Sequence, residues 1–263
     1  MLSKKQDLQH PVLSVVTIGL CSREIINTLS PFSQFLLDTR VEFIIVTPSN
    51  NIDVIAKKIS AVFVPDQGEG VYQAMNLGMS ASRGDYLWFL NSGDISLLNP
   101  DRFVSLLGFL SRQKMTPAKN SLLLFGFKLL IFHQPWLHFL HASIVKHLML
   151  FSVMPVSHQN ILFLRSRHEP FSLRYRYSCD FEILSKLIFG SESKVLLASS
   201  LPIAKLVAGG ISDSNRMSVF LERYSILRQL VPLYQTPFVV IGFLFRTLRE
   251  LVASKIKSII CAL

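Results

Sequence analysis

A carboxylate placed directly after an apolar segment is the chemically strongest feature of the sequence. Residues 86–90 (YLWFL) have the apolar character of a buried strand, and they are followed by Asn91, Ser92, Gly93 and Asp94. Glycine permits a tight turn and a close approach of ligand to backbone, and Mg²⁺ or Mn²⁺ is usually held by one or two carboxylates plus substrate phosphate oxygens. The pattern therefore predicts a cation site at Asp94, although a strand that ends in an Asx-type turn would have the same spacing.

Strand-like and helix-like segments alternate on both sides of this feature. Short β-branched or aromatic runs predict strands, and the segments between them predict helices. The predicted strands cover residues 12–18, 42–46, 61–64, 86–90, 121–132, 159–164 and 194–198, and the predicted helices cover 25–37, 52–59, the stretch from the 68–70 loop to about 80, a segment starting at Pro100, and 180–189. Such alternation is typical of an α/β fold with a mostly parallel sheet and helices on both faces. Ligands of these sheets bind beyond the carboxyl ends of the strands, where the loops 47–50, 66–70 and 91–94 should converge.

The composition limits the class of partner. The chain has 263 residues, of which 27 are Lys or Arg and 17 are Asp or Glu, giving a net charge of +10. This balance favours anionic partners such as lipids or phosphorylated substrates, and because no long basic block or zinc-finger spacing occurs, we expect no nucleic-acid partner. The 3 cysteines are widely separated, which fits a reducing compartment. No signal-peptide segment and no apolar run of about 20 residues is found, so we expect a cytoplasmic protein.

Two neighbouring segments together resemble the family 2 inverting glycosyltransferases. Residues 64–78 are VPDQGEGVYQAMNLG and residues 82–94 are SRGDYLWFLNSGD, whereas the usual family pattern is PDxGIYDAMNxG followed by AxGDYxxFLNxxD. Three later segments resemble the HQ block, the late acidic helix and the GGVS loop of the same family, in the same order: PVSHQNILF at 155–163, YSCDFEILSKL at 177–187 and GGIS at 209–212. The chain resembles in particular the colanic acid biosynthesis glycosyltransferases.

The resemblance implies a fold, a cofactor and a role for each matching residue. The fold would be GT-A, a Rossmann-like nucleotide-diphospho-sugar transferase fold over residues 1–232, with a donor half at about 12–115 and an acceptor half at about 116–232. Asp94 would bind Mn²⁺ or Mg²⁺, and Asp180 would be the general base that takes the proton of the acceptor hydroxyl. His158, Gln159 and Glu182 would lie on the acceptor side. The nucleotide-sugar donor would contact Thr47, Asp66, Tyr72, Asn76, Asn91, Gly209, Gly210 and Ser212.

Most of these residues also have a purely structural interpretation. The alternatives are a helix cap for Asp180 and for Asp66, a buried hydrogen-bonded histidine for His158, packing for Tyr72 and Asn76 on one helix face, and an ordinary turn for Gly209 and Gly210.

Departures from the family pattern leave more than one functional hypothesis open. Thr47 stands where the family has an Asp after the second strand, and Gln73 replaces the Asp of YDAMN. Because Asp94 and Asp180 are retained, we favour an active inverting glycosyltransferase over an inactive GT-A-like partner that binds nucleotide or glycan in a biosynthetic complex. A nucleotidyltransferase is a weaker alternative, since residues 18–22 after the first strand provide no Gly-rich phosphate loop.

The segment 233–263 has the pattern of a basic amphipathic helix. From residue 238 onward apolar residues recur at helical spacing, and most of the basic residues fall between them, at Arg246, Arg249, Lys255 and Lys257. This pattern suits an anionic membrane surface, but a helix packed on the core or a dimer interface would also explain it. Together with the resemblance, it suggests a peripheral enzyme at the inner face of the cytoplasmic membrane, with a polyprenyl-linked or oligosaccharide acceptor in bacterial surface polysaccharide biosynthesis.

Overall fold

A seven-stranded sheet forms the centre of the computed structural model, which describes residues 10–48, 60–115, 122–125, 145–190, 195–199, 201–206, 215–245 and 248. The strand order is β3-β2-β1-β4-β7-β6-β8. The strands are β1 (Leu13–Ile18), β2 (Val41–Thr47), β3 (Val62–Pro65), β4 (Tyr86–Phe89), β6 (Leu122–Phe125), β7 (Ile161–Leu164) and β8 (Val195–Ser199). Within this sheet, all described pairings are parallel except those of β7, which is antiparallel to β4 and β6. The sheet is therefore mostly parallel, as predicted.

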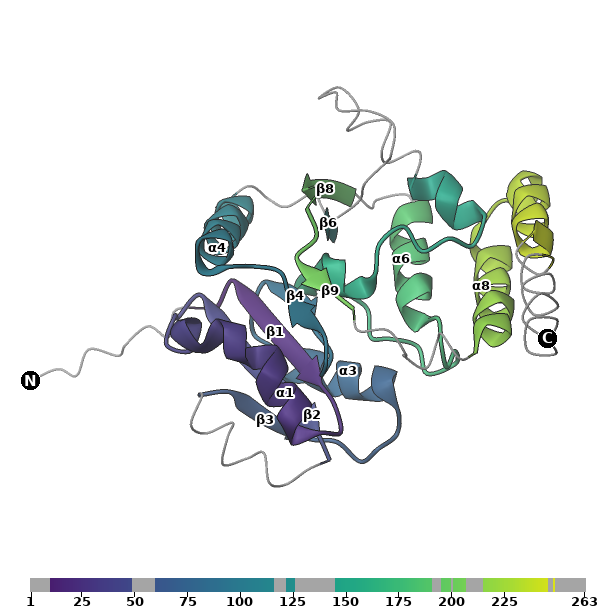
Figure 1. The fold of residues 1–263 in the computed structure, drawn as a ribbon. Helices are drawn as coiled ribbons and strands as arrows, with labels where there is room; N and C mark the ends of the chain where they lie inside the picture. Colours follow the sequence, from purple (N-terminus) through teal and green to yellow (C-terminus); the bar gives the residue numbers. More distant parts are fainter. Residues whose placement is uncertain are drawn as a thin grey trace, which may run out of the picture.

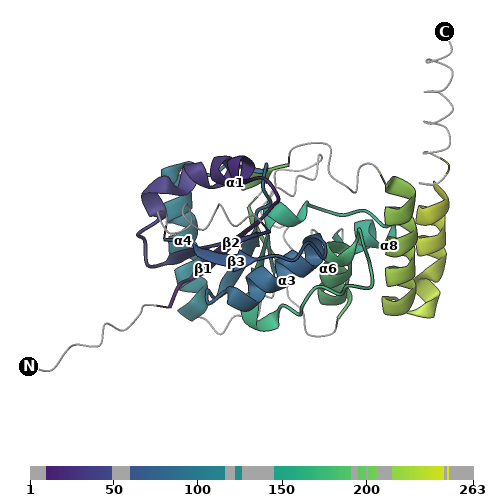
Figure 2. The same cartoon turned by 90° about the horizontal axis from the view of Figure 1, so that it is seen from below.

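Helices cover both faces of this sheet, which explains why its central strands are buried along their whole length. Every residue of β1 and β2 is buried, and successive side chains enter opposite cores. One core contains residues of α3 (Val71–Ala81) and α6 (Cys179–Phe189), and the other contains residues of α1 (Ser22–Leu29), the 3₁₀ helix η1 (Ser30–Phe35) and α4 (Pro100–Met115). Figure 2 shows α1 and α3 on opposite sides of the strands.

Some helix boundaries and short strands differ from the predictions. The helix predicted at 25–37 is divided into α1 and η1, because Pro31 has no N–H with which to continue the α-helical hydrogen bonds. Two short paired strands, β5 (Ile95–Ser96) and β9 (Ala204–Lys205), and helix α8 (Arg216–Leu230) were not predicted. The predicted helix at 52–59 lies outside the described residues, as do residues 126–144.

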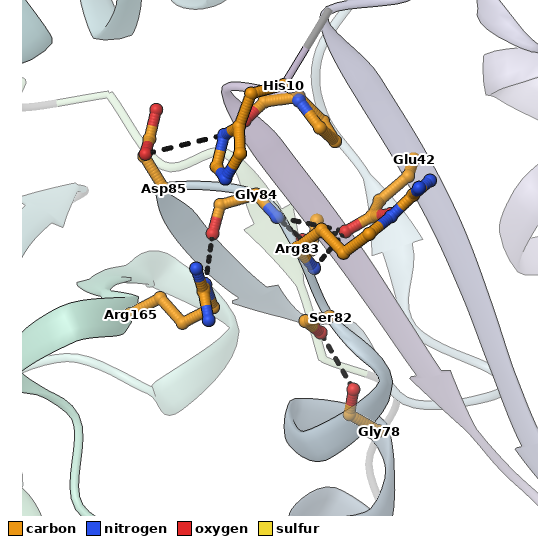
Figure 3. Close-up of polar contacts among 10 residues, drawn as sticks. His10, Glu42, Gly78, Ser82, Arg83, Gly84, Asp85 and Arg165 are labelled. Atoms are coloured by element: carbon orange, nitrogen blue, oxygen red, sulfur yellow. Dashed lines mark hydrogen bonds and ion pairs between the residues drawn. The ribbon is translucent and has the colours of Figure 1, made fainter. Parts of the chain in front are cut away.

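A buried carboxylate at the amino-terminal end of the sheet fixes the turn that precedes β4 (Figure 3). Glu42 accepts hydrogen bonds from Ser14 Oγ at 2.7 Å, from Gly84 N at 2.9 Å, and from the backbone and side chain of Arg83. Burial alone would raise the pKa of Glu42, but these hydrogen bonds hold it below its ordinary value. The turn is tight, because a Cβ on Gly84 would lie 2.7 Å from the backbone N of Ser14. The network sets where β4 begins, and therefore where its carboxyl end delivers Asp94.

The last described helix packs on the rest of the protein through one side only. Residues 236–245 form a helix that follows the 3₁₀ helix η6 (Leu233–Gln235) and lies beside α8, at the far end of the molecule from α1 (Figures 1 and 2). Val239 is fully buried, the rings of Tyr224 and Phe243 lie 5.1 Å apart, and a Cβ on Gly242 would lie 2.7 Å from the Phe151 backbone. None of the helices described is long and apolar enough to span a bilayer.

Candidate active site

The loops after β1 and β4 meet at the carboxyl edge of the sheet. Ser92 N donates a 2.8 Å hydrogen bond to Ile18 O at the end of β1. Gly19 follows Ile18, and a Cβ at this position would overlap Ser92 Oγ at 2.1 Å. Only glycine permits this approach of the two loops, which brings the Asn91–Asp94 turn over the end of β1.

Helix α1 holds this turn in place. Gly93 has a φ of 91°, a conformation that glycine adopts readily. Its N–H donates to Thr28 Oγ1 at 2.9 Å, and the same hydroxyl donates to the backbone oxygen of Asp94 at 3.2 Å. The predicted turn is thus clamped from one side by a buried threonine of α1.

Asp94 is 7% exposed and is surrounded by amide groups. Its Oδ2 accepts hydrogen bonds from Asn91 N at 3.1 Å and from Gln159 Nε2 at 2.9 Å. The side-chain oxygens Asn91 Oδ1 and Gln159 Oε1 are buried and have no hydrogen-bond partner within the described part of the chain. Two N–H donors thus orient Asp94 Oδ2, and the amide oxygens of Asn91 and Gln159 keep unused acceptor capacity.

Gln159 belongs to a tripeptide whose three side chains connect different parts of the site. The 3₁₀ helix η4 (His158–Asn160) lies just before β7. Asn160 Oδ1 accepts from the backbone N–H groups of Ile203 and Ala204 at 2.8 and 3.0 Å, and its Nδ2 donates to Ala204 O at 3.0 Å. These bonds position β9, which pairs with β5 directly after Asp94. Asn160 is not among the site residues that the sequence predicts.

Asp180 lies in the first turn of α6. The helix begins at Cys179 with Ser178 in the N-cap position, so the interpretation of Asp180 as the helix cap is wrong. Asp180 Oδ1 accepts from its neighbour Phe181 N at 2.8 Å and from Tyr72 OH at 3.2 Å, and Oδ2 lies 3.4 Å from His158 Nδ1. Both carboxylate oxygens are thus engaged by groups from α3, α6 and η4.

The surroundings of Asp180 favour its ionised form. Burial alone would raise the pKa of Asp180, but the hydrogen bond with His158 and the charge of Arg223 hold it below its ordinary value. Burial and the Asp180 charge raise the pKa of Tyr72 well above its usual value, so this hydroxyl stays protonated and donates.

Arg223 of α8 is a further part of the site that the sequence analysis missed. Its Nη1 donates to Ser152 O at 3.0 Å, and its guanidinium carbon lies 4.9 Å from the centre of the Phe181 ring. Burial lowers the pKa of Arg223, whereas the Asp180 charge opposes that shift. No pattern in the sequence distinguishes this arginine from the other basic residues.

One more contact joins the two halves of the site. Asn91 Nδ2 lies 3.3 Å from His158 Nε2, and His158 and Gln159 are consecutive residues. The contacts of Asn91, His158 and Gln159 therefore connect Asp94 and Asp180 in one polar network, although these carboxylates are far apart in the sequence.

The residues predicted to contact the nucleotide at β2 and β3 lie at the same edge of the sheet. Thr47 is the last residue of β2, is fully buried, and accepts a 3.1 Å backbone hydrogen bond from Asp66 N. Asp66 Oδ1 accepts from Gly68 N at 3.1 Å, which is an Asx-type turn. Helix α3 begins at Val71 with Gly70 as its N-cap, so the interpretation of Asp66 as a helix cap is wrong.

Other predicted site residues are separate from the network or outside the description. The Asn76 side chain makes two hydrogen bonds, of 2.9 and 2.7 Å, with the backbone of Phe171, which fits the packing alternative. Glu182 pairs with Lys186 at 3.1 Å on α6, and no described hydrogen bond joins it to His158. Gly209, Gly210 and Ser212 lie outside the described residues.

The residues around Asp94 fit a divalent cation that has one protein carboxylate as ligand. Within the described ranges no group of three His, Cys, Asp or Glu side chains could enclose a metal ion by itself. The donor set at Asp94 consists of oxygen atoms, which Mg²⁺ and Mn²⁺ prefer, and these ions commonly take most of their ligands from substrate phosphate and water. We assign Asp94 alone as the candidate ligand.

Comparison with known proteins identifies the fold. No protein-family model matches the chain, and no curated protein matches its sequence. Its structure is similar to S. aureus TarS, with a TM-score of 0.57 and 14% identity over 88% of this chain, although it spans only 42% of the TarS chain.

Two solved complexes show the same similarity. TarS 1–349 with UDP-GlcNAc has a TM-score of 0.55 and 14% identity, over 88% of this chain and 71% of that one. Glucosyl-3-phosphoglycerate synthase from Mycobacterium tuberculosis, in complex with Mn²⁺, UDP and glucosyl-3-phosphoglycerate, has a TM-score of 0.52 and 17% identity, over 85% and 81%. The chain therefore has the GT-A α/β fold of these glycosyltransferases, and the predicted fold class is confirmed.

Proposed function

We propose that this protein transfers a sugar from a nucleoside-diphosphate sugar to a hydroxyl acceptor, with inversion at the anomeric carbon. The observation that carries the proposal is the polar network that joins Asp94 and Asp180 at the carboxyl edge of a GT-A sheet. Such edges bind nucleotides in open α/β folds. Similar structures have been solved with UDP-GlcNAc and with Mn²⁺ and UDP-glucose, which supports a nucleotide-sugar donor.

On the donor side, Asp94 would hold the cation and Thr47 and Asp66 would lie near the nucleotide. When bound, a divalent cation supplies positive charge beside the diphosphate leaving group. The Gln159 amide fixes the orientation of the Asp94 carboxylate by its 2.9 Å hydrogen bond. Gly19 and Gly93 keep the two loops compact at this point, so that a phosphate group can approach the backbone.

On the acceptor side, Asp180 would drive removal of the hydroxyl proton. Inversion by single displacement requires a base on the face of the sugar opposite the leaving group. Asp180 is suited to this function because His158 and Arg223 keep it ionised and Tyr72 fixes its orientation. Replacing any of these neighbours should slow proton removal and leave the binding of the cation unchanged.

The apolar surface of the C-terminal helix supports a peripheral membrane location. Residues 231–245 contain no charged side chain. Seven large apolar residues in and around this helix are exposed: Leu233 at 89%, Tyr234 at 74%, Phe238 at 49%, Ile241 at 55%, Leu244 at 58%, Phe245 at 69% and Leu248 at 61%. Arg246, Arg249, Lys255 and Lys257 follow in the sequence, and a combination of apolar and basic residues suits anionic lipid headgroups. A lipid-linked saccharide would then be a suitable acceptor.

A binding screen followed by a turnover assay tests the proposed function. Thermal shifts with UDP, GDP and their sugars, with and without Mn²⁺, should identify a nucleotide whose stabilising effect depends on Mn²⁺ in the wild type but not in Asp94→Ala. The corresponding sugar donor should then release nucleotide in the presence of acceptor. Absence of any nucleotide-dependent shift would contradict the proposal.

The alternative is an inactive partner that binds nucleotide or glycan without transfer. Thr47, at the position of a family Asp, and the single carboxylate at the cation site favour it. Such a partner would show thermal shifts but would release no nucleotide from any donor, with any saccharide acceptor.

A further inference from the structure

The Asp180 carboxylate is crowded by its own hydrogen-bond donors. Phe181 N and Tyr72 OH both donate to Oδ1, at 2.8 and 3.2 Å, and His158 Nδ1 lies 3.4 Å from Oδ2. The Asp180 and His158 side chains are each only 17% exposed. Two donors already occupy Oδ1, so a substrate hydroxyl could reach this carboxylate only at Oδ2, on the side that faces the His158 ring.

The contacts of His158 determine which ring nitrogen carries the proton. An ionised carboxylate can only accept hydrogen bonds, so Nδ1 must carry the hydrogen that faces Asp180 Oδ2. In the neutral imidazole, Nε2 then has a free lone pair, and it accepts from Asn91 Nδ2 at 3.3 Å. This distance is long for a hydrogen bond, so a stronger donor could replace the amide.

We propose that His158 Nε2 is the atom that takes the proton from the acceptor hydroxyl, and that Asp180 acts through His158 as a positioning carboxylate. The inference rests on the proposed function. The hydroxyl O–H bond breaks and its proton moves to the Nε2 lone pair, while the oxygen forms a bond to the anomeric carbon. The bond from that carbon to the phosphate oxygen breaks, and its electron pair leaves with the nucleoside diphosphate. The imidazolium formed at His158 is stabilised by Asp180.

The other groups around the dyad fit this division of roles. Tyr72 of α3 donates a hydrogen bond that orients Asp180, and the charge of Arg223 on α8 favours the ionised carboxylate. The Asn91 amide belongs to the turn that carries Asp94, so Nε2 faces the candidate cation site. A carboxylate that orients the Nδ1–H tautomer and stabilises the imidazolium is an established arrangement for general-base catalysis by histidine.

Nitrogen NMR of the intact protein tests the dyad without any substrate. The chain has 7 histidines, and in protein labelled with ¹⁵N-histidine the His158 signals are assigned by their loss in His158→Gln. The wild type at neutral pH should show the Nδ1–H tautomer at His158, and Asp180→Asn should shift the tautomer balance. An Nε2–H tautomer in the wild type would overturn the inference.

Kinetics with chemical rescue test the catalytic role. His158→Ala and His158→Gln should each lower kcat about 10²–10⁴-fold, the usual contribution of a general base. Added imidazole should restore part of the activity of His158→Ala but not of Asp94→Ala. Nucleotide-induced thermal shifts should stay at the wild-type level in both His158 variants. This result would establish that the variants are folded and bind the nucleotide.

The outcomes separate this inference from the proposed function. If the wild type transfers sugar and both His158 variants have a kcat within tenfold of the wild-type value, the catalytic role of His158 is refuted. The transferase proposal then still stands. Lack of rescue by imidazole in a folded His158→Ala would do the same. Lack of wild-type turnover with every donor would refute the transferase proposal itself, and with it the catalytic role of the dyad.

Discussion

His168 should make the folded protein less stable as the pH falls below neutral. Its ring is 8% exposed and packs among Phe163, Phe171 and Phe89, with ring centroids 4.5, 5.0 and 5.8 Å away. Both ring nitrogens are buried, and a weak backbone contact with Glu169 only partly favours the charged ring. Burial in this apolar setting lowers the pKa of His168 from 6.5 to about 4.

The sign and size of the effect follow from proton binding to the two states. Between pH 6.5 and about 4 the unfolded chain binds a proton at this position that the folded chain does not bind, so the free energy of unfolding decreases as the pH decreases. One pKa unit corresponds to about 1.4 kcal/mol, and the whole window is therefore worth about 3 kcal/mol. From pH 7 to pH 5 the expected loss is about 2 kcal/mol.

Urea unfolding of the wild type and of His168→Leu between pH 7 and pH 5 measures this contribution. Carboxylates titrate in both proteins and cancel in the difference, whereas the contribution of His168 is present only in the wild type. The wild type should lose about 2 kcal/mol more than His168→Leu over this range. Equal pH dependence in the two proteins, or a wild type that gains stability on acidification relative to the variant, would refute the assignment of a neutral buried histidine.

Three further predictions concern the fold, Asp180 and the surface of the C-terminal helix. In urea unfolding, Gly84→Ala should lower the free energy of unfolding by about 2 kcal/mol or more, because its Cβ would meet the Ser14 backbone. The control Gly108→Ala should not lower it, because the nearest atom to its Cβ lies 3.6 Å away. Equal effects of the two substitutions would contradict the packing argument. Asp180→Asn should lower kcat about 10²–10⁴-fold with unchanged nucleotide-induced thermal shift, and wild-type turnover in this variant would exclude any role of Asp180 in proton removal. Phe245→Glu should reduce co-sedimentation with anionic vesicles, whereas Leu37→Glu, at an 87% exposed site in the loop after η1, should not; unchanged partition of Phe245→Glu would exclude this surface from membrane binding.

The parts of the fold that the sequence predicts well are those decided by local pattern. Segments such as β1 and β4 are mostly apolar and buried at every position because helices cover both faces of the sheet. The Asn91–Asp94 turn follows from Gly93 and from the end of the preceding strand. The change from α-helix to 3₁₀ helix near Pro31 also has a local cause, because proline lacks an N–H group. The apolar pattern of residues 25–37 does not show this change.

The parts that sequence patterns do not reveal depend on contacts between distant segments. The short strands β5 and β9 pair with each other, and Asn160 holds β9 in place by hydrogen bonds to its backbone. A strand of two residues is too short to show a periodic pattern in the sequence. Helix α8 buries Val219 and Phe220 on adjacent positions while Leu221 is exposed, which obscures an amphipathic pattern. The role of Arg223 beside Asp180 is likewise set by the packing of α8 on α6.

The central claim is that a cation site at Asp94 and the His158–Asp180 pair belong to one active site, and paramagnetic relaxation measures their proximity directly. In ¹⁵N-histidine-labelled protein saturated with the nucleotide that gives the largest thermal shift, Mn²⁺ should broaden the His158 ring signals, whereas Mg²⁺ should leave them sharp. The Asp94→Ala variant should show no broadening at the same Mn²⁺ concentration. His158 signals that stay sharp in the wild type when Mn²⁺ and nucleotide are both saturating would contradict the account.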